Sequence, residues 1–126
     1  MSDRRAEDLP RILANTRDLA RDGTASGAVW KLAMGERDLD ANVIALGPGD
    51  GIGEHAGPGL DVILHVVSGS GLLATEGGDV ELEPGGIVWL PRRTRRAFTA
   101  GPEGLAYFSV HRRKPGLGLS LRPDGS

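Results

Sequence analysis

Few side chains in this chain could carry out chemistry. It has three histidines, His55, His65 and His111, and no cysteine. The absence of cysteine excludes disulfides, thiol nucleophiles and thiolate metal sites, and it fits a reducing compartment. The sequence also has neither a G-x-S-x-G elbow nor a phosphate-binding P-loop. The chemistry that remains is proton transfer or metal binding by histidine, and anion binding by arginine.

The densest group of cations is the segment 91–96, with the sequence PRRTRR. It lacks the interleaved aromatic residues that stack on nucleic-acid bases. The formal net charge of −2 gives no overall field toward nucleic acid or an anionic membrane. Alternation in the strand that follows sends neighbouring arginines to opposite faces. We therefore predict no nucleic-acid or membrane partner, and a solvated turn with one inward-facing arginine.

Short β-strands must position these residues. The chain has 20 glycines and 8 prolines, which recur at short intervals after about residue 47, as turns do in all-β domains. We predict strands at residues 28–33, 41–46, 51–55, 60–67, 71–75, 79–82, 87–90, 95–99 and 106–111. The turn signals between them include segments 68–71 and 101–102. This regular spacing favours a closed barrel or sandwich over a βαβ fold.

The N-terminal residues follow another pattern. Apolar side chains approach helical spacing at Leu9, Ile12, Leu13 and Leu19. Pro10 suits a first turn and Gly23 suits a stop, so we predict an amphipathic helix over residues 6–21. A chain of 126 residues forms one domain. We divide it into an N-terminal helix and linker (1–26), a barrel (27–113) and a C-terminal arm (114–126).

The beginning of the chain carries charges where a signal peptide has an apolar run. No stretch approaches the roughly 20 apolar residues that a membrane span needs. We therefore expect a cytoplasmic protein. The excess of arginine over lysine, with abundant glycine and alanine, indicates a bacterial source with a GC-rich genome.

Two segments resemble the cupin family. Residues 51–71, GIGEHAGPGLDVILHVVSGSG, are similar to the first cupin motif, in which a glycine precedes a His-x-His pair, a glutamate and an apolar strand closing on glycine. Residues 82–98, LEPGGIVWLPRRTRRAF, are similar to the second motif, with its Pro-Gly turn, apolar strand, proline and final histidine. The resemblance implies an all-β, cupin-type double-stranded β-helix, the RmlC-like jelly-roll barrel. Cupins are commonly dimeric, so we expect a homodimer.

The same resemblance implies that the usual metal site is incomplete. Counting back from Gly69 places His55 at the first histidine position. Gly57 then takes the second histidine position and Val62 the glutamate position, while Arg96 takes the place of the third histidine. An arginine offers no lone pair to a metal ion, and its charge repels one. We therefore expect no metal and no other cofactor.

A register shifted by one residue does not restore the metal site. It would place Asp61 at the acidic position, with His65 four residues later. Residues four apart on a strand lie roughly 13 Å apart, too far to share one ion. Val62, Leu64 and Val66 form an apolar face of this strand. By alternation, Asp61 and His65 lie on the opposite face.

A cation beside a histidine remains inside the barrel that the resemblance implies. His55 and Arg96 would point into it from different strands, and Trp89 would lie near its mouth. The guanidinium fork matches a carboxylate or phosphate, because it donates two parallel hydrogen bonds. We predict a small-molecule binding protein whose ligand, an anionic metabolite, contacts His55, Arg96 and Trp89.

The sequence leaves other functions open, and with them the question of catalysis. A metal-independent isomerase, epimerase or cyclase would use His55 and Arg96 as its machinery. An atypical metal site around His55 would instead make the protein an oxygenase. In a purely structural interpretation, Arg96 fills the space of a lost metal site and pairs with Asp61, Glu54 or Glu81.

Overall fold

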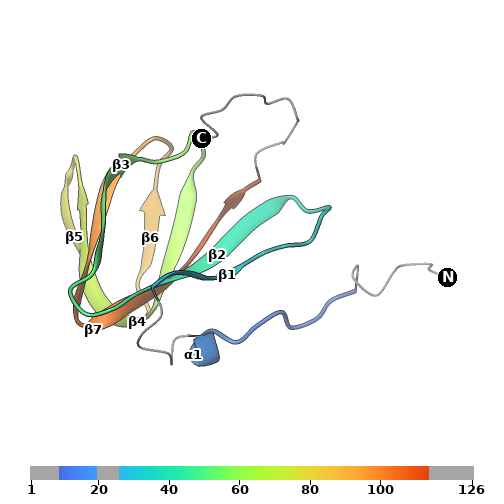
Figure 1. The fold of residues 1–126 in the computed structure, drawn as a ribbon. Helices are drawn as coiled ribbons and strands as arrows, with labels where there is room; N and C mark the ends of the chain where they lie inside the picture. Colours follow the sequence, from blue (N-terminus) through green and yellow to red (C-terminus); the bar gives the residue numbers. More distant parts are fainter. Residues whose placement is uncertain (1–8, 20–25, 114–126) are drawn as a thin grey trace.

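The computed structural model describes residues 9–19 and 26–113 (Figure 1). In this part of the chain, one short helix, α1 (Thr16–Leu19), precedes a seven-stranded antiparallel sheet. The strands are β1 (Gly27–Lys31), β2 (Leu39–Leu46), β3 (Gly51–Ala56), β4 (Val62–Thr75), β5 (Gly78–Leu82), β6 (Ile87–Leu90) and β7 (Arg95–Arg112). The predicted all-β class is confirmed.

Strands β4 and β7 belong to both layers of the sheet. The first half of β4 and the second half of β7 lie with β6, β2 and β1, and their other halves lie with β5 and β3. Both strands bend between the layers, so that the two ends of β7 lie on the same side of the molecule (Figure 1). We call this side, with Arg96 and His111 near the ends of β7, the rim. The opposite side, with Gly69 and Gly104, is the bend.

The turns predicted at residues 68–71 and 101–102 are wrong, because both segments lie inside continuous strands. The pairing of β4 with β7 shifts register next to Gly69, where the strands bulge and bend. Gly69 and Gly104 have φ angles of 75° and 80°. Glycine adopts this left-handed conformation without steric cost. The glycines therefore bend the strands without ending them.

Alternation sorts the side chains between a buried inner face and an outer face. Val62, Leu64 and Val66 of β4 are 5%, 1% and 0% exposed. Ile63 and His65, which lie between them, are exposed. The inner faces of the two layers pack together in a core that includes Leu46, Leu73, Leu82, Leu90, Phe98 and Leu105.

A short N-terminal helix is confirmed, but its predicted extent over residues 6–21 is wrong in the described part. The helix spans only Thr16–Leu19, and residues 9–15 are not helical. The Asn15 side chain accepts a hydrogen bond of 2.8 Å from a backbone N–H two residues later, which caps the helix there. A longer helix would need a surface for its apolar face, whereas Ile12 is 89% exposed.

No helix in the described ranges is long and apolar enough to cross a membrane. The described strands run from Gly27 to Arg112, inside the barrel predicted over residues 27–113. The predicted arm at 114–126 lies outside the described residues, so the division into these segments stays a prediction.

Candidate functional site

The inner face of the barrel changes from apolar at the bend to polar at the rim. Along the second half of β7 it carries, in order, Leu105, Tyr107, Ser109 and His111. Strand β2 repeats this order in register with Leu46, Ile44, Asn42 and Asp40. Along the first half of β7 the order toward the rim is Ala100, Phe98 and Arg96. Polar side chains of both layers are therefore gathered at one end of the barrel.

Arg96 is the only buried charged residue in the described part of the chain, with 6% of its surface exposed. Its Nε donates a hydrogen bond of 3.2 Å to the carbonyl oxygen of Thr94. Its Nη2 is buried and has no acceptor among the described residues. A buried charged donor is costly until an acceptor is supplied. The guanidinium therefore keeps an unsatisfied donor on the inner face of the barrel.

The sequence left open a pairing of Arg96 with Asp61, Glu54 or Glu81, and this interpretation is wrong for the described chain. Glu54 pairs with Arg95, with 2.9 Å between Oε2 and Nε. Asp61 pairs with Arg92, with 3.6 Å between Oδ1 and Nε. Glu81 is exposed on β5 and forms no ion pair with Arg96. Two carboxylates are thus held by the outward-facing neighbours of Arg96 in the same basic segment.

The guanidinium of Arg96 packs against Gly57, the residue at the second histidine position of the resembled motif. A Cβ added at this glycine would overlap Nη2 and Cζ of Arg96. The segment is held in place by the turn before β7, because the N–H of Gly57 donates to the carbonyl oxygen of Thr94 at 3.0 Å. The missing side chain at 57 therefore provides the space that Arg96 fills.

Tyr107 shares this environment. It is 5% exposed and stacks on Phe98, with 4.9 Å between ring centroids. Burial raises the pKa of Tyr107 to about 12, and the positive charge of Arg96 opposes this rise. Burial also lowers the pKa of Arg96, yet a guanidinium stays protonated in proteins. At neutral pH the inner face of the barrel therefore combines a cation with a neutral phenol.

The raised pKa of Tyr107 predicts a loss of stability in strong base. The folded state holds the phenolic proton more tightly than the unfolded chain, in which the tyrosine pKa is 10.0. Its stabilising contribution is therefore complete below pH 10.0 and is lost as the pH rises toward about 12. We expect this loss to reach about 2–3 kcal/mol. Because the chain has one tyrosine, tyrosinate absorbance reports the titration directly. A Tyr107 pKa close to 10.0 in the folded protein would contradict the burial of this side chain.

His55 lies directly opposite Arg96 in the β3–β7 ladder. Opposed residues of antiparallel strands project to the same face, with Cβ atoms about 5 Å apart. His55 is exposed to solvent whereas Arg96 is buried. Its Nδ1 lies 2.9 Å from the carbonyl oxygen of Gly53. With the proton on Nδ1, the Nε2 lone pair is available to a ligand.

The structure does not bring Trp89 to Arg96. In the ladder, Trp89 pairs with Ile63, and the two are 56% and 43% exposed. Their chain neighbours Leu90 and Val62 are 2% and 5% exposed and face the core. Trp89 therefore lies on the outer face, on the opposite side of its layer from the inner face that carries Arg96.

The residues at the positions of the resembled metal site do not fit a metal ion. His55 supplies one ligand, Gly57 supplies none, and Val62 is an aliphatic core residue. Arg96 brings a positive charge into the same space. Within residues 9–19 and 26–113, no cluster of three or more histidine or carboxylate side chains could hold a metal.

Sequence reasoning missed Tyr107 and the pair formed by Asn42 and Ser109. The Ser109 hydroxyl donates to Oδ1 of Asn42 at 2.6 Å on the inner face. The alternation of Tyr107 with Ser109 along the last predicted strand was an available signal. This alternation could be assigned to the inner face only once β7 was known to pass through both layers.

The two-layered barrel has the cupin fold, as comparison with solved structures shows. A cupin protein from Bacteroides fragilis has a TM-score of 0.65 and 15% identity, over 94% of this chain and 96% of that one. The cupin domain of Cnp3 from Schizosaccharomyces pombe has a TM-score of 0.59 and 14% identity, over 67% and 62%. A sugar phosphate isomerase of the cupin superfamily from Silicibacter pomeroyi has a TM-score of 0.56 and 19% identity, over 68% and 59%. The match spans less than two thirds of the last two structures, and these likenesses concern the fold alone.

The model of the AraC-like ligand binding domain family matches residues 43–122. This chain therefore belongs to the AraC-like ligand-binding domain family, and it has the cupin fold that the sequence motifs indicated. The matched segment includes His55, Arg96 and Tyr107. No curated protein matches the sequence.

Proposed function

We propose that this protein binds a small organic anion through Arg96 at the rim of the barrel. The observation that carries the proposal is the buried guanidinium whose Nη2 lacks an acceptor among the described residues. An anion would supply that acceptor, and a charged hydrogen bond in a low-dielectric site contributes more than a neutral one. Membership of a ligand-binding family supports the same proposal.

Three side chains would form the ligand contacts. Arg96 binds the carboxylate or phosphate, Tyr107 donates a second hydrogen bond, and His55 contacts the ligand from the rim. Because Nη2 is buried against Gly57, binding requires the guanidinium to swing away from this glycine toward the rim. The ligand is thus expected to change the Arg96 rotamer while the strands stay in place.

Isothermal titration calorimetry tests the proposal with a panel of inorganic phosphate, ribose 5-phosphate, malate and citrate. We expect at least one anion to bind the wild type and to bind Arg96→Met at least about tenfold more weakly, as the loss of a charge-assisted hydrogen bond predicts. Arg95→Met is the matched control, because its side chain is 55% exposed and pairs with Glu54. Equal binding to both variants, or no binding to the wild type, would refute the proposal.

A metal-independent isomerase that uses the same residues is the second candidate. It is favoured by the direct opposition of His55 and Arg96, which would set a base beside the bound anion. Catalysis of this kind exchanges a carbon-bound proton of the ligand with solvent. We expect deuterium from heavy water to enter a bound hydroxy acid or sugar phosphate with the wild type and not with His55→Gln. Binding without exchange in the wild type would leave the protein a binding module.

The homodimer and the cytoplasmic location predicted from the sequence remain proposals for this protein. Light scattering coupled to size-exclusion chromatography measures the first directly, with twice the chain mass of 13.2 kDa as the expected result. A single species at the mass of one chain would contradict it.

A further inference from the structure

A cavity lies on the outer face of the β1–β2–β7–β4–β6 layer, next to the rim. Its volume is about 380 Å³, and the residues that line it include Leu39, Ile63, Trp89, Arg92, Val110 and Arg112. Pockets for small organic ligands range from about 300 to 1,000 Å³. Neither Arg96 nor His55 lines it, so it is distinct from the site proposed above. We call it the Trp89 cavity.

The floor of the Trp89 cavity is apolar. Trp89, Ile63 and Val110 are register neighbours across β6, β4 and β7 and therefore stand side by side on one face. The indole is the largest group among them and is 56% exposed. Exposed indole of this extent on a sheet is a surface on which an aromatic ring can stack.

The wall of the cavity carries a net positive charge. Asp61 accepts a hydrogen bond of 3.0 Å from the backbone N–H of Arg92 and lies 3.6 Å from its Nε, so these two charges offset each other. Arg112 forms no ion pair with a described residue and lines the same cavity. One guanidinium beside the apolar floor therefore has no carboxylate partner among the described residues, and it complements a single negative charge.

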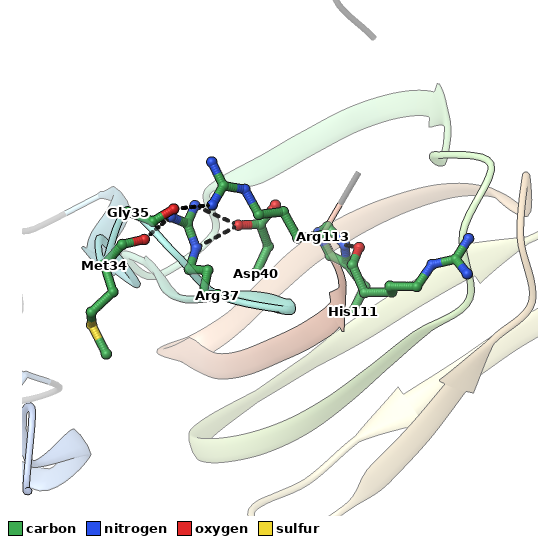
Figure 2. A network of polar contacts seen from close by, with 7 residues as sticks. Met34, Gly35, Arg37, Asp40, His111 and Arg113 are labelled. Carbon is green, nitrogen blue, oxygen red and sulfur yellow. Dashed lines mark hydrogen bonds and ion pairs between the residues drawn. The ribbon is translucent and has the colours of Figure 1, made fainter. Parts of the chain in front are cut away.

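The strand end that carries Arg112 is held in place by the β1–β2 connection. Figure 2 shows Arg113 donating to the carbonyl oxygen of Gly35, at 2.7 Å, and Arg37 joined to Asp40 of β2, with 2.7 Å between Nη2 and Oδ1. The N–H of Arg113 also donates to the carbonyl oxygen of Asp38 at 2.8 Å. These contacts fix the backbone beside Arg112, which limits the ordering that binding at this wall requires.

We propose that the Trp89 cavity binds a small aromatic carboxylate, with its ring stacked on Trp89 and its carboxylate bound by Arg112. The apolar floor disfavours a hydrated phosphate or sugar, whereas an aromatic ring buries both its own surface and that of the indole. The guanidinium of Arg112, which has no ion-pair partner in the described part of the chain, matches one carboxylate. This proposal does not depend on anion binding at Arg96.

The test is titration of the wild-type chain with 2-naphthoate, followed by proton–nitrogen correlation spectra. The chain has two tryptophans, Trp30 and Trp89, so its indole N–H signals can be assigned with Trp89→Phe. We expect a saturable shift of the Trp89 signal and none for Trp30, which lies against Phe108 with 6.4 Å between ring centroids. The neutral 2-naphthamide should bind at least about tenfold more weakly, because it lacks the charge that pairs with Arg112.

Three variants complete the experiment. Arg112→Gln should weaken naphthoate binding at least about tenfold, while Arg95→Gln, the matched exposed control, leaves it unchanged. Arg96→Met should also leave it unchanged, which separates this site from the barrel site. The remaining backbone signals report whether each variant is folded.

Two results would overturn the proposal. One is the absence of a saturable Trp89 shift up to about 5 mM naphthoate, a concentration at which millimolar binding would be visible. The other is a Trp89 shift that depends on protein concentration without any ligand, since a second copy of the chain would then occupy this face.

Discussion

Arg96→Met is expected to raise the free energy of unfolding by about 1–3 kcal/mol, because replacing a buried charge with an apolar group of similar length often stabilises a protein. Arg96 is 6% exposed, and its Nη2 has no acceptor among the described residues, so the native state carries an uncompensated desolvation cost. Methionine is unbranched and can fill the same space against Gly57. Urea denaturation of the two proteins at neutral pH measures the difference.

The control for this measurement is Arg95→Met, one residue away on the same strand. Its side chain is 55% exposed and forms a surface ion pair with Glu54, so its removal should change stability by about 1 kcal/mol or less. If Arg96→Met instead unfolds more readily than the wild type, Arg96 is a structural element of the barrel. A stabilised variant that no longer binds anions would show that the wild type keeps a costly charge for its function.

Gly69→Ala is expected to lower the free energy of unfolding by about 2–4 kcal/mol. Its φ of 75° disfavours any residue with a Cβ, at a cost of about 1 kcal/mol. The added Cβ would also overlap the carbonyl oxygen of Gly104, at the point where β4 and β7 bend together. The clashing atoms belong to the backbone of the paired strand, so overpacking should add about 1–3 kcal/mol more. Chemical denaturation measures the loss.

Gly49→Ala separates the two contributions. Gly49 has nearly the same φ, 77°, but a Cβ there would meet no atom within 4 Å. Gly49→Ala should therefore lower the free energy of unfolding by only about 1 kcal/mol. Equal losses for the two variants would show that the approach of Gly69 to Gly104 does not constrain the bend.

The β-strands themselves could be predicted from the sequence. Alternation is a local property, since successive side chains of a strand face opposite ways. It assigned Val62, Leu64 and Val66 to the core face, and the structure confirms this with exposures of 5%, 1% and 0%. The glycine and proline pattern of the two motifs also indicated the cupin fold correctly.

Where alternation is absent, the face of a residue could not be predicted. Strand β6 consists of Ile87, Val88, Trp89 and Leu90, so no polar residue marks its outer side. Trp89 was therefore expected near the mouth of the barrel, and the structure places it on the outer face. The predicted extent of the helix was wrong for a related reason. The apolar spacing near Ile12 indicates one face of a helix, but it does not show whether another part of the protein packs against that face.

The sequence by itself determined the strand pattern, the cupin motifs and the loss of their ligand residues. Only the tertiary structure decided that Arg96 packs on Gly57, that it has no carboxylate partner in the described chain, and that its charge acts on Tyr107. Contacts across strands depend on register, and register here depends on the bends at Gly69 and Gly104. These bends carry each long strand from one layer into the other, so residues distant in sequence meet at one rim.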